Sequence, residues 1–181
     1  MKPAYKGLLL IVFIIIVAQL FYYSGSTGKK QETEKFFLEN FKAADIDGNI
    51  VGSEIFEDYD LSMVYIWGTF CPQCVRALPM IEGLSVKYAD RVNVMGLLCD
   101  VQLQDGSPNR EKVLLAHDMM DANGAGFLNI MMSADMDISA IGGLPFVPTT
   151  FFVDNKGYVV GEVYVGGKSL SEWSDIIDGI L

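Results

Sequence analysis

The fold of this chain is decided by residues 66–74, which read Ile66-Trp67-Gly68-Thr69-Phe70-Cys71-Pro72-Gln73-Cys74. The stretch closes an apolar run, residues 61–67, that is typical of a buried strand. Pro72 is tolerated in the first turn of a helix, so we predict a helix from here through residue 88, with a kink at Pro79. Unpaired backbone N–H groups and the helix dipole at such a start favour a thiolate at Cys71, while Cys74 lies one turn further in and is less accessible.

Regular elements are predicted on both sides of this stretch. Asp47-Gly48, between short apolar segments in residues 43–51, indicates a hairpin. The elements expected after it are strand 92–99, a helix from Ser107-Pro108 to Asn123-Gly124, strand 149–153, turn 154–157, strand 158–164, and a helix from the Ser169–Glu172 capping box to Leu181. This order predicts an α/β fold with parallel strands first and antiparallel strands later, hence a central mixed β-sheet with helices on both faces.

A second informative stretch, residues 147–157, reads Val147-Pro148-Thr149-Thr150-Phe151-Phe152-Val153-Asp154-Asn155-Lys156-Gly157. With residues 66–74 and the following Leu78-Pro79, it makes the sequence resemble the thioredoxin-like superfamily, and within it the membrane-anchored TlpA/ResA-like thiol–disulfide oxidoreductases. A Cys-x-x-Cys pair alone is a weak signal. A Trp four residues ahead, a Pro five residues after the second cysteine and a Val-Pro-Thr before a strand make it specific. The resemblance covers roughly residues 43–181.

The resemblance implies a thioredoxin-like fold and a redox-active disulfide between Cys71 and Cys74. Cys71 would be the nucleophile, and Cys74 would be the resolving cysteine that closes the disulfide. The resemblance also implies a substrate-binding surface. Val147 would offer its backbone to an extended substrate strand, and Pro148 would be a cis proline facing the cysteines. Phe70 would lie on this surface, and Trp67 would pack beneath the site. The missing N–H of Pro148 would leave room there for a guest chain.

Three positions depart from the family pattern. Ala77 stands where many relatives have a Glu, and Tyr65 stands where thioredoxins proper carry a buried Asp. Phe70 replaces the usual Trp before Cys71, which should alter the surface that faces the substrate. The sequence therefore leaves open which group accepts the proton of Cys74.

Composition excludes several other kinds of site. The 23 acidic and 13 basic residues give a net charge of -10, and such a chain is repelled by nucleic acid. A lone Cys-x-x-Cys lacks the second ligand pair of a structural zinc site, and a single histidine, His117, makes triads and multi-histidine copper sites improbable. We expect His117 on a helix surface or rim, and Cys99 as a core residue at the end of a strand. No metal or bound cofactor is predicted.

The N-terminus contains an uncharged apolar run, residues 7–23, preceded by Lys2 and Lys6. As a helix it would span about 25 Å, slightly less than a hydrocarbon core of about 30 Å. No Ala-x-Ala cleavage site follows it, so we predict an uncleaved signal anchor rather than a cleaved signal peptide. The expected organisation is a transmembrane helix in residues 1–24, a flexible linker in 25–35, and a domain in 36–181 that faces outside the cytoplasm.

Together these observations predict a single-pass membrane protein that reduces disulfides of exported proteins. Its electrons would come from a membrane electron-donor protein, because the sequence has no flavin or nicotinamide motif. Three alternatives stay open. The first alternative is a disulfide oxidase or isomerase, because the dipeptide Pro72-Gln73 does not fix the reduction potential. The others are a non-catalytic copper chaperone using both thiols, and a scaffold that keeps the fold without the activity.

Overall fold

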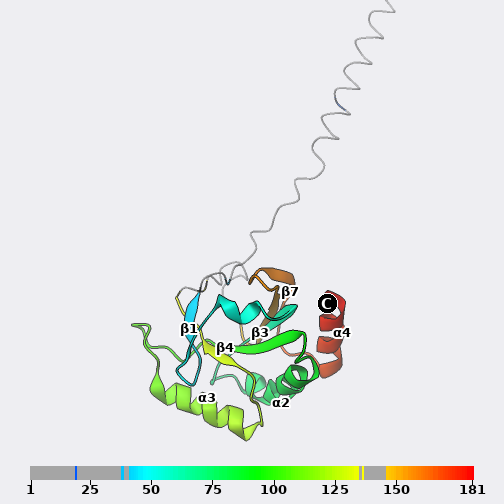
Figure 1. Cartoon of the computed structure of the whole chain (residues 1–181). Helices are drawn as coiled ribbons and strands as arrows, with labels where there is room; N and C mark the ends of the chain where they lie inside the picture. The colour runs from blue at the N-terminus through cyan, green and yellow to red at the C-terminus, as the bar shows by residue number, and fades with distance from the viewer. Residues whose placement is uncertain (1–18, 20–37, 39–40, 135, 137–145) are drawn as a thin grey trace, which may run out of the picture. The chain divides into compact units, whose positions relative to one another are not determined.

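The computed structural model describes residues 19, 38, 41–134, 136 and 146–181 (Figure 1). Apart from Gln19, the predicted transmembrane helix in residues 1–24 and the linker in 25–35 lie outside this range and remain predictions. Among the described residues, no helix has the length and apolar character needed to cross a bilayer.

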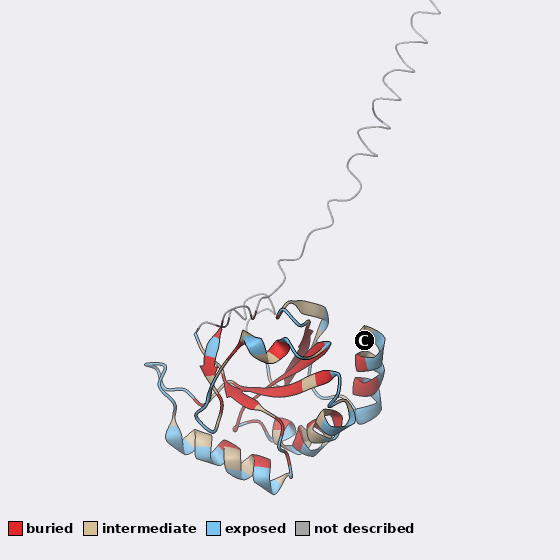
Figure 2. Ribbon diagram, viewed as in Figure 1, coloured by how far each residue is buried: buried red, intermediate tan, exposed pale blue. Residues whose placement is uncertain are grey.

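A mixed sheet of five strands organises the described part of the chain. The strands are β3 (Leu61–Trp67), β4 (Val92–Leu98), β5 (Asn129–Met131), β6 (Thr149–Val153) and β7 (Val159–Val165). They lie in the order β5-β4-β3-β6-β7, with β3, β4 and β5 parallel and with β6 antiparallel to both β3 and β7. The central strands are buried along their whole length, as the red ribbons of Figure 2 show. The predicted mixed sheet is confirmed.

Three α-helices contribute to the core on one face of this sheet. They are α2 (Pro72–Lys87), α3 (Arg110–Ala122) and α4 (Leu170–Ile180). The crossovers from β3 to β4 and from β4 to β5 run in the same direction across the sheet, and because such connections are right-handed, α2 and α3 lie on the same side. Members of this core include Tyr65, Trp67, Leu78, Met120, Phe152 and Trp173.

The opposite face has a different cover in the described residues. There, Val64, Ile66 and Phe151 pack with two aromatic residues. These are Phe56 of the 3-10 helix η1 (Ser53–Phe56) and Phe41, which directly precedes β1. The hairpin of β1 (Lys42–Ala44) and β2 (Ile50–Gly52) adjoins this cluster. Among the described residues, the three α-helices thus lie on one face of the sheet and the 3-10 helix η1 lies on the other, so the predicted cover by helices on both faces is seen there only through η1.

Several element boundaries differ from those predicted. Helix α3 begins at Arg110, because Asn109 caps it by accepting a hydrogen bond from the Lys112 backbone N–H, while Pro108 forms a bridge with Gln102. Helix α2 continues across Pro79, and β7 starts one residue later than expected. The capping box of α4 is present as predicted.

Candidate active site

The two cysteines form a disulfide at the start of α2. Cys71 is the N-cap residue and Pro72 occupies the first turn, where its missing N–H leaves no hydrogen bond unmade. The sulfur of Cys71 accepts a hydrogen bond from the Cys74 backbone N–H at 3.1 Å. Cys71 is 7% exposed and Cys74 is fully buried, so only the first sulfur borders the surface. The order of attack, with Cys71 first and Cys74 second, stays a prediction.

A tight turn carries Cys71 from β3 into α2. The Cys71 backbone N–H donates to the Gly68 carbonyl oxygen at 3.0 Å. A Cβ atom at Gly68 would lie 2.6 Å from the Phe70 ring and 3.2 Å from the Asp100 carboxylate, so a larger residue there would crowd the turn and displace the ring. Phe70 itself is 63% exposed and presents an apolar ring beside the disulfide.

The segment before β6 lies against the disulfide. The Val147–Pro148 peptide bond is cis, as predicted. The Val147 carbonyl oxygen lies 3.7 Å from the Cys71 sulfur, which places the proline loop directly opposite the reactive cysteine. The Pro148 carbonyl accepts a hydrogen bond from the Gly166 N–H at 2.8 Å, which ties this loop to the end of β7.

Trp67 lies in the core beneath the site and is fully buried. Its indole N–H donates to the Asn129 side-chain oxygen at 2.7 Å, and the Asn129 amide donates to the Phe127 carbonyl at 2.9 Å. A Cβ at Gly96 would collide with that Asn129 oxygen, so the glycine makes room for the bond. Trp67 therefore supports the site from below and does not form part of its surface.

Tyr65, which stands in place of a buried carboxylate, reaches the second cysteine. Its hydroxyl donates to the Cys74 carbonyl oxygen at 3.1 Å. Burial raises the pKa of Tyr65 above its ordinary value, so the side chain stays a neutral donor. Ala77 is half-buried and offers no ionisable group. Neither residue supplies a carboxylate base for Cys74.

An aspartate that the sequence analysis did not single out holds the active-site turn. The Asp100 carboxylate accepts hydrogen bonds from the Thr69 N–H at 3.0 Å, the Thr69 hydroxyl at 2.7 Å and the Lys112 ammonium at 2.7 Å. Burial alone would raise the pKa of Asp100, but the hydrogen bonds from Lys112 and Thr69 outweigh it and hold the pKa below its usual value. Asp100 is therefore an ionised anchor for the turn that leads to Cys71.

Cys99 is a free cysteine of intermediate exposure at the end of β4. Burial, assisted by the neighbouring Asp100 charge, raises the pKa of its thiol to about 11. At neutral pH this thiol is protonated and a poor nucleophile.

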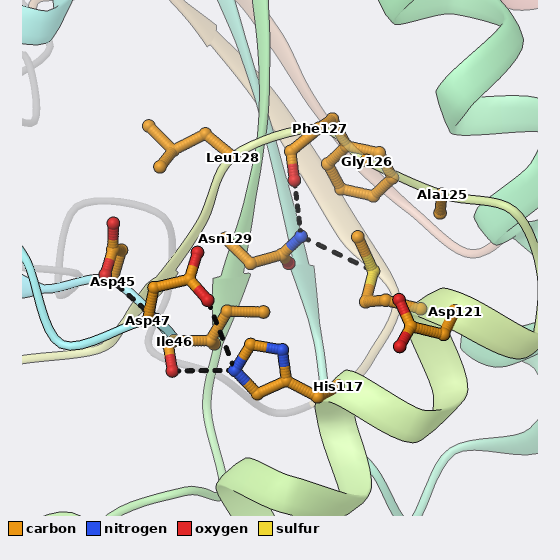
Figure 3. A pocket seen from close by; sticks show the side chains of 11 residues that line it. Asp45, Ile46, Asp47, His117, Asp121, Ala125, Gly126, Phe127, Leu128 and Asn129 are labelled. Carbon is orange, nitrogen blue, oxygen red and sulfur yellow. Dashed lines mark hydrogen bonds and ion pairs between the residues drawn. The ribbon is translucent and has the colours of Figure 1, made fainter.

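His117 lies away from the disulfide, at a cavity of about 450 Å³ beside the β1–β2 hairpin (Figure 3). Its Nε2 atom is 2.8 Å from the Ile46 carbonyl oxygen and 3.6 Å from the Asp47 carboxylate. Asn129, the partner of Trp67, lines the same cavity. The prediction of a rim position for His117 is confirmed, since the ring is half-buried on α3.

The curated proteins that are similar to this chain are a thiol-disulfide oxidoreductase and a thioredoxin-like protein. No protein-family model matches the sequence. Over 130 residues it is 26% identical to the thiol-disulfide oxidoreductase ResA of Halalkalibacterium halodurans, a match that covers 72% of this chain and 67% of that protein. Over 117 residues it is 24% identical to the thioredoxin-like protein YneN of Bacillus subtilis, covering 64% of this chain and 62% of YneN, which is less than two thirds of its length. Among solved structures, a thiol:disulfide interchange protein of Chlorobium tepidum TLS is similar with a TM-score of 0.64 and 22% identity, over 81% of this chain and 97% of that one.

Proposed function

We propose that this chain, a thioredoxin-like thiol–disulfide oxidoreductase, reduces disulfides of exported proteins outside the cytoplasm. The observation that carries the proposal is the position of the Cys71 sulfur, between the Cys74 N–H and the Val147 carbonyl. The first contact favours negative charge on Cys71, and the second marks where an extended substrate backbone would lie.

The exchange would proceed in two steps. The Cys71 thiolate attacks one sulfur of a substrate disulfide, the other substrate sulfur leaves as a thiolate, and a mixed disulfide forms. Cys74 then loses its proton and attacks the Cys71 sulfur, which releases the second substrate thiolate and closes the Cys71–Cys74 disulfide. Two electrons have passed to the substrate, and a dithiol donor protein in the membrane would return them by the reverse exchange.

The surroundings of the disulfide support a polypeptide as substrate. Phe70 and Phe146 are 63% and 66% exposed, and each precedes one half of the site in the chain. Val165, which is 60% exposed, pairs with Thr149 next to Pro148. Such exposed apolar side chains around a reactive group are typical of an interaction surface. We therefore propose an extended, partly apolar segment around the substrate cysteine.

The apolar run in residues 7–23 supports the proposed location. It would hold the domain at the membrane, with the domain on the side where exported proteins carry disulfides. Expression of the full chain followed by protease treatment of intact cells tests this, because only a domain outside the cytoplasm is cleaved.

The reduction potential decides between reductase and oxidase. The full chain in detergent, carrying Cys99→Ser so that only two thiols are counted, is equilibrated in glutathione buffers and read by alkylation and mass spectrometry. A potential near or below about -250 mV is expected for a reductase. A value above about -180 mV would favour the oxidase or isomerase, and no two-electron couple would contradict both.

The substrate surface is tested separately with a synthetic peptide that holds one disulfide between apolar residues. Phe70→Ser together with Phe146→Ser should raise the KM for this peptide about tenfold and leave the reduction potential unchanged. Val86→Ser is a matched control, because Val86 is 69% exposed but lies about 20 Å along α2 from Cys71.

A further inference from the structure

A partly buried charge pair adjoins the turn that leads to Cys71. The Asp100 side chain is 10% exposed and its Lys112 partner is 38% exposed, with 2.7 Å between the carboxylate and ammonium groups. Asp100 follows β4 and Lys112 lies in the first turn of α3, so both are held by regular elements. The pair contacts the active-site turn through Thr69, whose N–H and hydroxyl both donate to Asp100.

The hydrogen bonds that run through Thr69 and Asp100 limit how far both charges can lie from Cys71. Thr69 is two residues before Cys71, and two peptide units span at most about 8 Å between Cα atoms. With the hydrogen bonds from Thr69 and Lys112 to Asp100 added, both charges lie at most about 15 Å from the Cys71 Cα atom, which is about one and a half Debye lengths at 0.1 M salt. Their partial burial reduces this screening, so the interaction survives in ordinary buffers.

The two charges have opposite effects on the redox equilibrium. The Cys71–Cys74 disulfide is neutral, whereas the reduced site carries negative charge when Cys71 is a thiolate. A nearby carboxylate disfavours that thiolate, and a nearby ammonium stabilises it. Reduction of the disulfide takes up two electrons and one proton and yields the Cys71 thiolate and the Cys74 thiol, so stabilising that thiolate makes reduction easier.

We propose that the Asp100–Lys112 pair tunes the reduction potential of the Cys71–Cys74 disulfide, with Lys112 favouring the thiolate and Asp100 opposing it. This inference rests on the proposed oxidoreductase function and adds two tuning residues that do not touch the substrate. Lys112 also neutralises Asp100, so the potential of the unmodified site lies between those of the two single variants.

The test measures the equilibrium constant for reduction of the disulfide by glutathione, in full-length chains that all carry Cys99→Ser. Lys112→Met should lower this constant about three- to tenfold, because Asp100 is then uncompensated. Asp100→Asn should raise it by a similar factor, because Lys112 is left as an unpaired cation. A tenfold change corresponds to about 30 mV for a two-electron couple.

Three further variants separate charge from structure. Lys112→Arg keeps the cation and should leave the constant within twofold of the unmodified value. Arg110→Met removes a cation from the same turn of α3 without touching the contacts of Asp100, and it should also have little effect. Thr69→Val removes one donor to Asp100 but no charge, so it should lower thermal stability and leave the constant within twofold.

The outcomes are distinct. Opposite shifts for Lys112→Met and Asp100→Asn support tuning by charge. Shifts in the same direction, no shift, or a Thr69→Val shift as large as that of Lys112→Met would overturn it, because the pair would then act only by holding the turn. If Asp100→Asn does not fold, the comparison of Lys112→Met with Lys112→Arg and Thr69→Val still decides. Absence of any couple in the unmodified chain would instead reject the proposed function.

Discussion

Cys71 and Cys99 follow the neighbouring parallel strands β3 and β4, yet the electrostatic effect of their surroundings on a thiolate is opposite. Cys71 caps a helix, and its sulfur accepts a hydrogen bond from the Cys74 backbone N–H at 3.1 Å. Cys99 caps no helix and lies next to the Asp100 charge, which together with burial raises the pKa of its thiol to about 11. Cys71 is nevertheless the more buried of the two, at 7% exposure against an intermediate value for Cys99.

With Cys71 as the proposed reactive thiol, exposure does not decide which thiol reacts. The decisive features are the backbone donors and the sign of the nearest charge, because the thiolate is the reactive form. Asp100 connects the two environments, since it bonds to the Thr69 that precedes Cys71 and directly follows Cys99. A single carboxylate thus disfavours the thiolate at both positions, and only Cys71 has the helix start to offset it.

The largest expected effect is the loss of chemistry at Cys71. Cys71→Ser should abolish the two-electron couple and reduce peptide-disulfide turnover by about a thousandfold or more, because the nucleophilic sulfur is gone. Cys99→Ser is the matched control and should keep both. The measurement is turnover of the disulfide peptide with dithiothreitol as donor. Loss of turnover in Cys99→Ser would break the contrast between the two thiols.

The next effect concerns the rate of alkylation. With a pKa of about 11, only about one Cys99 thiol in a thousand is ionised at pH 8. In the reduced chain, iodoacetamide should therefore modify Cys71 about a hundredfold faster than Cys99 at this pH, as read by peptide mass spectrometry. The Cys99 rate should then rise about tenfold per pH unit as the pH approaches 11. A Cys99 rate that levels off near pH 9 would show that burial and Asp100 do not act as described.

The sequence was sufficient where the signals are local. Strand β3 and the start of α2 follow from one apolar run and one Cys-Pro pair, and the capping box of α4 lies within four residues. Strand β5 was missed because it has three residues and begins with the polar Asn129 after a glycine-containing segment. Its place depends on pairing with β4, which no local pattern reports.

The residues of the candidate site also divide into those that a local motif indicates and those that depend on distant partners. Cys71, Cys74 and Pro148 belong to short motifs, so the sequence indicated them, and the structure places them together. Asp100 and Asn129 were missed because their partners Thr69 and Trp67 are 31 and 62 residues away. An Asp at the carboxyl end of a parallel strand next to β3 was the one available signal, since functional groups gather at that edge of an α/β sheet.

A smaller effect is expected from crowding the turn that leads from β3 to Cys71. Gly68→Ala places a methyl group 2.6 Å from the Phe70 ring and 3.2 Å from Asp100, so the ring must move and the turn is crowded. We expect a loss of about 1–3 kcal/mol in the free energy of unfolding, measured by urea denaturation. Gly83→Ala in α2 is the control, because its methyl group meets nothing within 4 Å and should stabilise by about 0.5–1 kcal/mol.

Restoring the space should restore part of the stability. Phe70→Ala added to Gly68→Ala removes the closer contact. The double variant should therefore lose less free energy of unfolding than the sum of the losses of the two single variants. Strictly additive losses would mean that the Phe70 ring does not constrain the turn.

The smallest effect is the pH dependence that Asp100 contributes. Its pKa is lowered in the folded chain, while an unfolded Asp titrates near 3.9. Its stabilising contribution is therefore fully present above about pH 5 and is lost as the pH falls below about 4 through the lowered folded value. The difference in free energy of unfolding between the unmodified chain and Asp100→Asn should be constant from pH 5 to 7 and shrink below pH 4.

Asp105 provides the control for this measurement. Its pKa is also lowered, by hydrogen bonds from Ser107, but the group is on the surface. High salt should therefore change the contribution of Asp105 little, because its partner Ser107 is neutral, and should weaken only the part of the Asp100 contribution that comes from the Lys112 ion pair. If the Asp100 difference instead stayed constant down to pH 2, the carboxylate would not be stabilised by Thr69 and Lys112. The Asp100 charge would then not stabilise the turn. The difference in thiolate stability between Cys71 and Cys99 would have to come from burial and the helix start alone.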